Sequence, residues 1–191
     1  IALVKPLIDA GLLAKDVPLT YAGISGYSGG GKKMIEDYEA KGSSASHFAP
    51  YALGLAHKHL PEMKHYTGTS RDVLFQPAVG DFAQGMLTST PLHLSQFKAG
   101  VTGRDIHAAI AAHHAGARFV TVAGLDDAAN LNPQAVNGSN DMRLHVFAND
   151  ARGQVVLMAI YDNLGKGASG AAVQNLNLMT GADEAASVNL S

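Results

Sequence analysis

The stretch between residues 142 and 160 constrains the fold more than any other part of the sequence. Met142 to Phe147 alternates with a period of two, which is typical of a strand. The turn-forming residues 149–153 follow, and a second apolar segment, Val155 to Ile160, comes directly after them. Two such segments joined by a short polar turn are typical of an antiparallel hairpin. The sequence therefore predicts an antiparallel pair of strands in this region.

Helical patterns and further strand patterns occupy the rest of the chain. Residues Thr102-Gly103-Arg104-Asp105 resemble a capping box with Asp in place of Glu, and apolar residues follow at helical spacing as far as Gly116. We also expect helices over 3–13, bent around Pro6, over 32–40, from Pro61, and over 166–179, and strands over 17–24, 49–56, 73–75, 86–92 and 119–122. Strands joined both by turns and by helices predict an α+β protein, with a mixed, largely antiparallel sheet and helices on one face.

Composition excludes several kinds of function. The 191 residues carry 14 Lys and Arg against 16 Asp and Glu, so no strong field attracts nucleic acid or an anionic membrane. No apolar stretch is long enough to span a bilayer. The chain has no cysteine, which excludes disulfides, thiolate metal sites and a cysteine nucleophile carried by this chain. It opens without an initiator Met on apolar residues at helical spacing, so we expect it to be part of a longer protein.

A glycine-rich loop at residues 26–31 precedes one expected helix, and its three successive glycines predict irregular structure. With Lys32 it fits the G-x-x-x-x-G-K pattern of nucleotide-binding loops, and 119–126 imitates the strand that holds magnesium. Position 33 is lysine where that pattern needs Ser or Thr on the metal, which argues against an NTPase. Backbone N–H groups, two serine hydroxyls and Lys32 could instead bind an anionic group of a substrate. A solvated surface turn is the alternative.

Histidines cluster between residues 57 and 65. On a strand, His57 and His59 point to one face, which suits two metal ligands or a general base with its neighbour. Glu62 and His65 share a helix face and could add a metal ligand, but no H-E-x-x-H pattern accompanies them. We therefore expect no metal here. The alternative is that these histidines hydrogen-bond neighbouring backbone groups.

A third candidate site begins at Asp162. An apolar strand feeds a polar, glycine-bearing turn that starts a helix of small residues. We expect Asn163 to be exposed at this switch and well placed to hydrogen-bond a ligand amide. The alternative is a well-capped terminal helix.

These segments together resemble a known enzyme family. They are the run DNLGKGASGAAVQNLNLM at 162–179, the segment from Pro50-Tyr51 through His57 to Glu62, and the Ser25–Gly29 loop. They are similar to N-acetyl-gamma-glutamyl-phosphate reductases, and GYSGGGKK at 26–33 with GDFAQGM at 80–86 indicates the shorter, second type. The similarity covers essentially the whole chain. Semialdehyde dehydrogenases of related fold share a diluted form of the first run.

The resemblance implies a division into two parts. Residues 1–161 would form a substrate-binding, catalytic and dimerisation domain, like the C-terminal domain of glyceraldehyde-3-phosphate dehydrogenase. Residues 162–191 would form a terminal helix that packs on an N-terminal NADP-binding domain of the same protein. The family's nucleophilic cysteine and cofactor domain lie outside this chain, so we expect the isolated chain to be inactive.

The resemblance also implies an activity and its residues. The complete enzyme would use NADPH to reduce N-acetyl-gamma-glutamyl phosphate to N-acetylglutamate semialdehyde, releasing phosphate, as a cytoplasmic homo-oligomer in arginine biosynthesis. The implied residues are His57, with His59 as alternate, for acid–base catalysis; Asn163, Leu164, Gly165 and Lys166 for NADP; and Ser25, Gly26, Ser28, Gly29 and Lys32 for the anionic end of the substrate. Two alternatives remain: a non-enzymatic anion- or metal-binding module built from the glycine loop and the histidines, and a related semialdehyde dehydrogenase.

Overall fold

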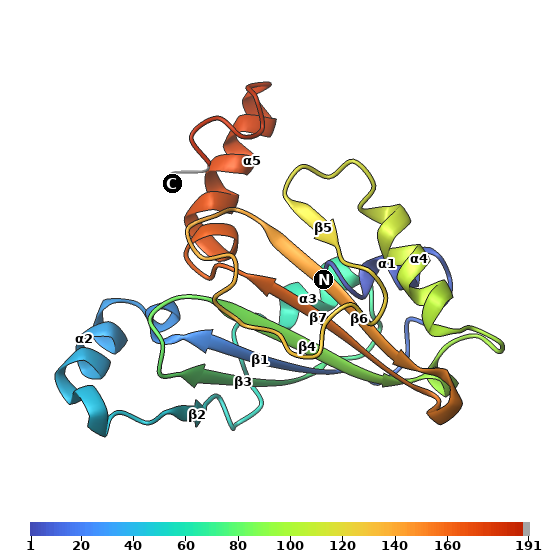
Figure 1. The fold of residues 1–191 in the computed structure, drawn as a ribbon, viewed down its shortest axis with the longest axis horizontal. Helices are drawn as coiled ribbons and strands as arrows, with labels where there is room; N and C mark the ends of the chain where they lie inside the picture. The colour runs from blue at the N-terminus through green and yellow to red at the C-terminus, as the bar shows by residue number, and fades with distance from the viewer. Residues whose placement is uncertain (189–191) are drawn as a thin grey trace.

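A seven-stranded sheet in the order β2-β3-β1-β4-β7-β6-β5 organises residues 1–188, which are the residues that the computed structural model describes (Figure 1). The β1–β3 and β5–β6 pairs are parallel, and the other four pairs are antiparallel. The prediction of a mixed, largely antiparallel sheet is therefore confirmed. The strands are β1 (Thr20–Gly26), β2 (Phe48–Pro50), β3 (Leu74–Gly80), β4 (Met86–His93), β5 (Val120–Val122), β6 (Met142–Asn149) and β7 (Gln154–Tyr161).

The hairpin predicted from the alternating pattern is present as β6 and β7. Its register pairs Leu144 with Ala159 and Asn149 with Gln154. The side-chain oxygen of Asn149 accepts the backbone N–H of Arg152 at 3.1 Å, which closes the turn between the strands. The pairing and the turn chemistry agree, so the register of this hairpin is set locally.

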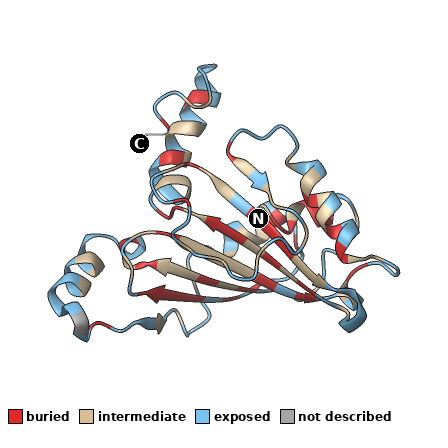
Figure 2. Ribbon diagram, in the orientation of Figure 1, coloured by how far each residue is buried: buried red, intermediate tan, exposed pale blue. Residues whose placement is uncertain are grey.

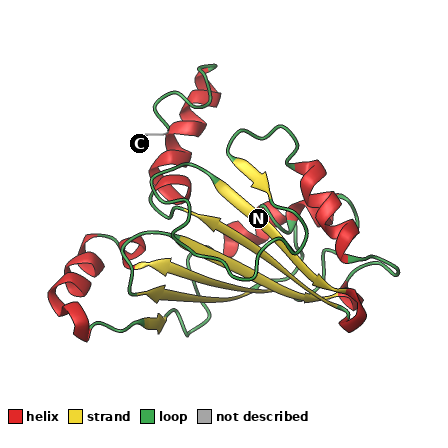
Figure 3. Ribbon diagram, viewed as in Figure 1, coloured by secondary structure: helices red, strands yellow, loops and turns green. Residues whose placement is uncertain are grey.

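The described residues contain five α-helices, which Figure 3 shows around the sheet. In the helix over 103–113, Thr102 and Asp105 form a capping box: the Thr102 hydroxyl accepts the Asp105 N–H at 3.3 Å, and the Asp105 carboxylate accepts the Thr102 N–H at 2.9 Å. No helix within residues 1–188 is long and apolar enough to cross a membrane. The helices are α1 (Lys5–Asp9), α2 (Lys32–Lys41), α3 (Leu60–Thr67), α4 (Gly103–His113) and α5 (Gly170–Thr180).

The core lies between one face of the sheet and three of these helices. Leu7 of α1 and both Ile106 and Ile110 of α4 are fully buried, at 0% exposure. They pack with inward-facing strand residues such as Leu144 and Leu157, and α3 adds partly buried side chains to the same cluster. Figure 2 shows this buried layer along the strands and helices. The prediction of helices on one face is confirmed for α1, α3 and α4.

The expected strand over 49–56 is mostly wrong. Only Phe48–Pro50 pairs with the sheet, and the chain then leaves it. Ala52 and Leu55 have φ angles of 52° and 56°, in the left-handed region that a strand does not contain. Residues 51–59, which include His57 and His59, therefore lie in a loop between β2 and the helix that begins at Leu60.

Two further segments differ from the sequence prediction. The glycine-rich loop is not wholly irregular, because Tyr27–Gly30 forms one 3₁₀ turn before α2. The terminal helix starts as a π-helical turn over Gly165–Ser169, so its α-helical part begins only at Gly170. Figure 1 shows α5 standing away from the sheet.

Candidate functional site

Three turns meet at one edge of the sheet because of its topology. Gly26 at the end of β1 pairs with Gly80 at the end of β3, and Met86 at the start of β4 pairs with Tyr161 at the end of β7. The turns that follow or precede these ends are 26–31, 81–85 and 162–165. The glycine loop and the DNLG turn, which are far apart in sequence, are therefore neighbours.

Asn163 joins all three turns. Its Oδ1 accepts the backbone N–H of Gly85 at 2.7 Å, and its Nδ2 donates to the Ser28 hydroxyl at 2.9 Å. Asn163 is only 9% exposed, and Ser28 is 8% exposed. The expectation that Asn163 is exposed is therefore wrong, because partners from two other turns cover it. One amide hydrogen and one oxygen lone pair of Asn163 are left over by these two bonds.

Asp162, the preceding residue, holds a second set of turns together. Its Oδ2 accepts from Gln84 Nε2 at 2.5 Å and from the Gly138 N–H at 2.9 Å, and its Oδ1 accepts the Leu164 N–H at 2.8 Å. The residue is 1% exposed. Three N–H donors thus stabilise a buried carboxylate that would otherwise be costly. The partners of Asp162 lie 24 and 78 positions away, apart from Leu164, and no sequence pattern indicated them.

Close packing explains two of the glycines in these turns. A Cβ on Gly26 would lie 2.6 Å from the carbonyl oxygen of Ala83, and a Cβ on Gly165 would collide with the carbonyl oxygen of Ser139. Neither neighbour is a flexible side chain that could move away. These glycines are needed for backbone segments to approach each other, with or without a ligand.

Several backbone N–H groups of the glycine loop, which the sequence suggested could bind an anion, already donate to other groups of the chain. The N–H groups of Gly26, Tyr27 and Ser28 donate to carbonyl oxygens of the 82–85 turn at 2.9–3.1 Å. The Ser25 hydroxyl donates to the neighbouring Gly26 carbonyl at 3.0 Å. These three N–H groups are used within the chain, so the expected cradle of free backbone N–H groups is wrong for them.

Gly29 and Lys32 were also expected at the substrate, and they differ in how accessible the structure leaves them. A Cβ on Gly29 would lie 2.7 Å from the Ser25 hydroxyl oxygen, so Gly29 keeps this loop compact. Lys32 has a side chain that is 90% exposed and lies 3.7 Å from Glu36, in a surface ion pair that contributes little stability. The Lys32 ammonium therefore stays accessible to an anion.

Lys166 anchors the terminal helix. Its Nζ donates to Gln174 Oε1 at 2.6 Å and lies 5.7 Å from the centre of the Phe119 ring. Gln174 in turn donates to the Glu184 carboxylate at 2.6 Å. Burial lowers the pKa of Lys166, and the nearby Glu184 and Asp141 carboxylates oppose that shift. The Lys166 ammonium is thus engaged by groups of this chain.

His57 and His59 lie together, but a turn rather than a strand brings them there. The Nδ1 of His57 accepts the backbone N–H of His59 at 3.2 Å, and the two ring centres are 5.1 Å apart. The His57 ring also packs edge-on against Phe75, with centres 5.0 Å apart. Partial burial, followed by the nearby His59 and Lys58, lowers the pKa of His57. The prediction of a shared strand face is wrong because the chain has already left the sheet.

Glu62 is the partner of His59. The His59 Nδ1 lies 2.9 Å from Glu62 Oε2, three residues further along at the start of α3. From the sequence, Glu62 was expected near these histidines only as a possible metal ligand. Within residues 1–188, no group of three or more His, Asp or Glu side chains is arranged to hold a metal ion.

The histidines and the three turns lie apart. Phe75, which contacts His57, is paired with Tyr21, five positions before Gly26 on β1. At about 3.3 Å per residue, this separation is roughly 17 Å along the sheet. The structure therefore brings the glycine loop to the DNLG turn, but it does not bring the histidines to either of them.

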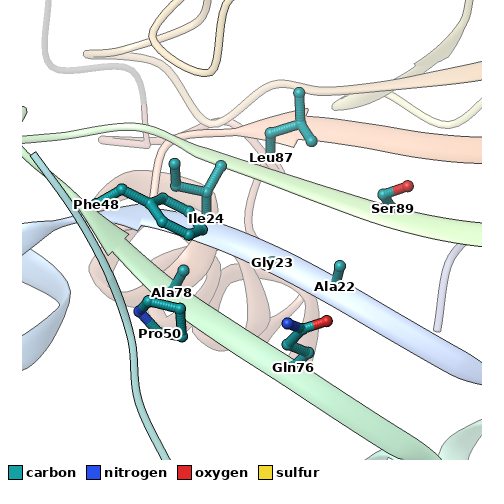
Figure 4. Close-up of a pocket in the computed structure, with 9 residues that line it drawn as sticks. All are labelled: Ala22, Gly23, Ile24, Phe48, Pro50, Gln76, Ala78, Leu87 and Ser89. Atoms are coloured by element: carbon teal, nitrogen blue, oxygen red, sulfur yellow. The ribbon is translucent and has the colours of Figure 1, made fainter.

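A shallow groove of about 190 Å³ lies on the sheet, and Figure 4 shows the side chains that line it. Its lining residues Ala22 and Gln76 follow the core residues Tyr21 and Phe75 on their strands, so the groove is on the face opposite the core. Phe48 and Pro50 border it on one side, and Ile24 and Leu87 lie across from them in the figure. The lining is mostly apolar and consists of Ala22, Gly23, Ile24, Phe48, Pro50, Gln76, Ala78, Leu87 and Ser89. We call this surface the sheet groove.

Curated proteins of similar sequence are named as reductases of one kind. N-acetyl-gamma-glutamyl-phosphate reductase from Chelativorans sp. (strain BNC1) is 56% identical over 184 residues, which are 94% of this chain and 59% of that protein. The enzyme of the same name from Mesorhizobium japonicum is 54% identical, over 95% of this chain and 60% of that protein. This chain therefore spans about 60% of the length of these relatives.

The solved structures establish the fold. Aspartate semialdehyde dehydrogenase II from Vibrio cholerae has a TM-score of 0.69 at 15% identity, covering 94% of this chain and 58% of that one. The aspartate semialdehyde dehydrogenase from Francisella tularensis has a TM-score of 0.67 at 13% identity, covering 94% of this chain and 61% of that one. A family model described as "Semialdehyde dehydrogenase, dimerisation domain" matches residues 1–163. The chain thus belongs to the family of semialdehyde dehydrogenase dimerisation domains.

Proposed function

We propose that this chain is the substrate and dimerisation part of an N-acetyl-gamma-glutamyl-phosphate reductase. The complete enzyme would reduce N-acetyl-gamma-glutamyl phosphate to N-acetylglutamate semialdehyde and release phosphate, in cytoplasmic arginine biosynthesis. The observation that carries the proposal is identity of 54–56% to reductases over nearly the whole chain. The semialdehyde dehydrogenases are only 13–15% identical, so they support the fold and not the substrate.

The reaction needs a nucleophile from the N-terminal part of the protein, because this chain has no cysteine. We propose that a cysteine thiolate forms a C–S bond to the acyl carbon, while the C–O bond to phosphate breaks and phosphate leaves with its electron pair. NADPH, when bound, would supply the hydride that reduces the resulting thioester, and the C–S bond would then break to release the semialdehyde and restore the thiolate. His57, or His59 as alternate, would assist as an acid–base group near the thiol. Because the loop that carries them lies apart from the DNLG turn in this structure, that loop would have to move toward the turn for one acyl group to meet both.

Only part of the expected NADP site fits the cofactor. Gly165 is required by packing, and the Lys166 ammonium is engaged by Gln174. Asn163 keeps one amide hydrogen beyond its two bonds, and Leu164 is 41% exposed. We propose that Asn163 donates this hydrogen to the nicotinamide carboxamide and that Leu164 packs beside it. The rest of the cofactor site would come from the N-terminal domain.

Two of the residues expected at the substrate keep accessible polar groups. The Lys32 ammonium is exposed, and the Ser25 hydroxyl makes one hydrogen bond to its neighbour. We propose that these two groups contact the anionic end of the substrate. Gly26, Ser28 and Gly29 would support this loop through the packing described above.

Two exposed apolar surfaces suit the expected partners. The sheet groove faces away from the core helices, and we propose that a second copy of the chain covers this face in a homo-oligomer, as the name of the matched family suggests. Leu176, Leu178 and Met179 on α5 are 57–85% exposed. We propose that these side chains pack on the N-terminal cofactor domain.

An activity assay with and without the N-terminal part tests this function. We expect the purified 191-residue chain to show no oxidation of NADPH with N-acetyl-gamma-glutamyl phosphate. Addition of the N-terminal part, or use of the full-length protein, should produce that activity. Turnover by the 191-residue chain alone would contradict the proposal.

A further inference from the structure

We propose that Asn137 is a site of spontaneous deamidation, and that its rate is set by how firmly the loop 133–138 holds the DNLG turn. Asn137 and Gly138 form the one Asn-Gly pair in the sequence. Asn137 is exposed, so water reaches its side chain. The modification follows from the chemistry of this chain, and only its link to a cofactor rests on the proposed function.

The glycine after Asn137 makes this amide the most labile in the chain. Asparagine is a thermolabile residue, because the next backbone nitrogen can attack its side-chain carbonyl carbon. Gly138 has no Cβ that would hinder this attack. A bond forms between the Gly138 nitrogen and Asn137 Cγ, the bond from Cγ to Nδ2 breaks, and ammonia leaves with the proton of the Gly138 nitrogen. Water then opens the five-membered ring, which yields aspartate or isoaspartate.

Two hydrogen bonds hold the reacting groups apart in the folded chain. The Gly138 N–H donates to the buried Asp162 carboxylate at 2.9 Å. The Asn137 Nδ2 donates to the Gln84 carbonyl oxygen at 2.8 Å. The Asn137 Oδ1 is packed closely, because a Cβ on Gly85 would lie only 3.0 Å from it. Attack requires the Gly138 nitrogen to leave Asp162, so deamidation proceeds from a locally opened loop.

Deamidation would prevent the loop from closing again on the DNLG turn. A carboxylate at position 137 can only accept hydrogen bonds, and it would face the Gln84 carbonyl oxygen, which also only accepts. Isoaspartate lengthens the main chain as well, which displaces the Gly138 N–H. The buried Asp162 carboxylate would then keep two of its three N–H donors. Modification at this one amide therefore weakens the support of the turn that carries Asn163.

Peptide mapping by mass spectrometry tests the site on the 191-residue chain, stored in mildly alkaline buffer. We expect Asn137 to deamidate before Asn130, an exposed asparagine of the same β5–β6 connection that a leucine follows. Deamidation of Asn137 should be slower in native buffer than in urea, because the folded loop is closed. Earlier modification of Asn130, an Asn137 that stays intact in native buffer, or equal rates in native buffer and urea would overturn the proposal.

A variant that reproduces the product tests the effect on the fold. Asn137→Asp should lower the Tm of the 191-residue chain by roughly 2–6 °C, because the bond to Gln84 is lost. Asn130→Asp is the matched control, since it adds the same charge to the same connection, and its Tm should stay near wild type. Equal Tm values for the two variants would contradict the coupling between Asn137 and the DNLG turn.

NADPH tests the link to the cofactor in the full-length protein. Because we propose that the cofactor contacts Asn163, bound NADPH should keep the loop closed. With NADPH at about 100 times its Kd, deamidation of Asn137 should slow by up to about 100-fold, while Asn130 keeps its rate. If NADPH binds without slowing deamidation, the proposed cofactor contact at the DNLG turn is refuted, and the site stands on the mapping of the 191-residue chain. Failure of that mapping refutes the deamidation site alone.

Discussion

Replacing Asn163 with alanine should destabilise the fold, because this side chain joins three turns. The substitution leaves the buried Gly85 N–H without its acceptor at 2.7 Å, which costs about 1–3 kcal/mol. It also removes the 2.9 Å bond to Ser28, which contributes about 0.5–1.5 kcal/mol. Together the free energy of unfolding should fall by roughly 2–4 kcal/mol. For a chain of this size, that corresponds to a Tm lower by about 4–16 °C.

Urea denaturation monitored by circular dichroism measures this change. Asn175→Ala on α5 is the matched control, because Asn175 is exposed on its helix. The control should change the unfolding free energy by no more than about 0.5 kcal/mol. If Asn163→Ala is as mild as Asn175→Ala, the three turns do not depend on this amide, and its remaining role would be toward a ligand.

Further predictions concern the loops, a helix cap and two histidines. Gly26→Ala should lower stability by about 1–3 kcal/mol in urea denaturation, because its new Cβ meets backbone atoms of the neighbouring turn; a neutral effect would show that the turn can move. Thr102→Ala should cost about 1 kcal/mol in the same assay through loss of the α4 cap, and an unchanged midpoint would argue against the cap. Burial lowers the pKa of His114, so its unfolded form binds more protons. The urea midpoint should therefore fall as pH drops below the ordinary value of 6.5, and His114→Gln should reduce that fall; a midpoint that rises on acidification would contradict the sign. In the full-length protein, His57→Asn should lower kcat by about 10²–10⁴-fold while urea unfolding stays near wild type, and wild-type turnover would exclude His57.

Local signals in the sequence predicted much of the fold. The capping box at Thr102 and the hairpin around Asn149 are each defined by residues a few positions apart, and both are present. The structure of the segment 49–56 could not be predicted from such local signals. Its apolar residues suit a strand, but the left-handed φ angles at Ala52 and Leu55 take it out of the sheet.

The site was harder to predict because its contacts are distant in sequence. Asn163 bonds to residues 78 and 135 positions away, and no local pattern reveals such partners. This is why an amide expected at the surface is buried between turns. The Glu62 contact is different, because it spans only three residues. Helical spacing alone could have indicated it once His59 was recognised as the residue that precedes α3.

A comparison of two acyl phosphates in the full-length protein tests the proposed function most directly. The assay measures NADPH oxidation and phosphate release with N-acetyl-gamma-glutamyl phosphate and with aspartyl phosphate, the acyl phosphate that corresponds to aspartate semialdehyde. We expect kcat/KM to favour the N-acetylated substrate strongly, with one phosphate released for each NADPH oxidised. Preference for aspartyl phosphate would contradict the proposal and would indicate an aspartate semialdehyde dehydrogenase.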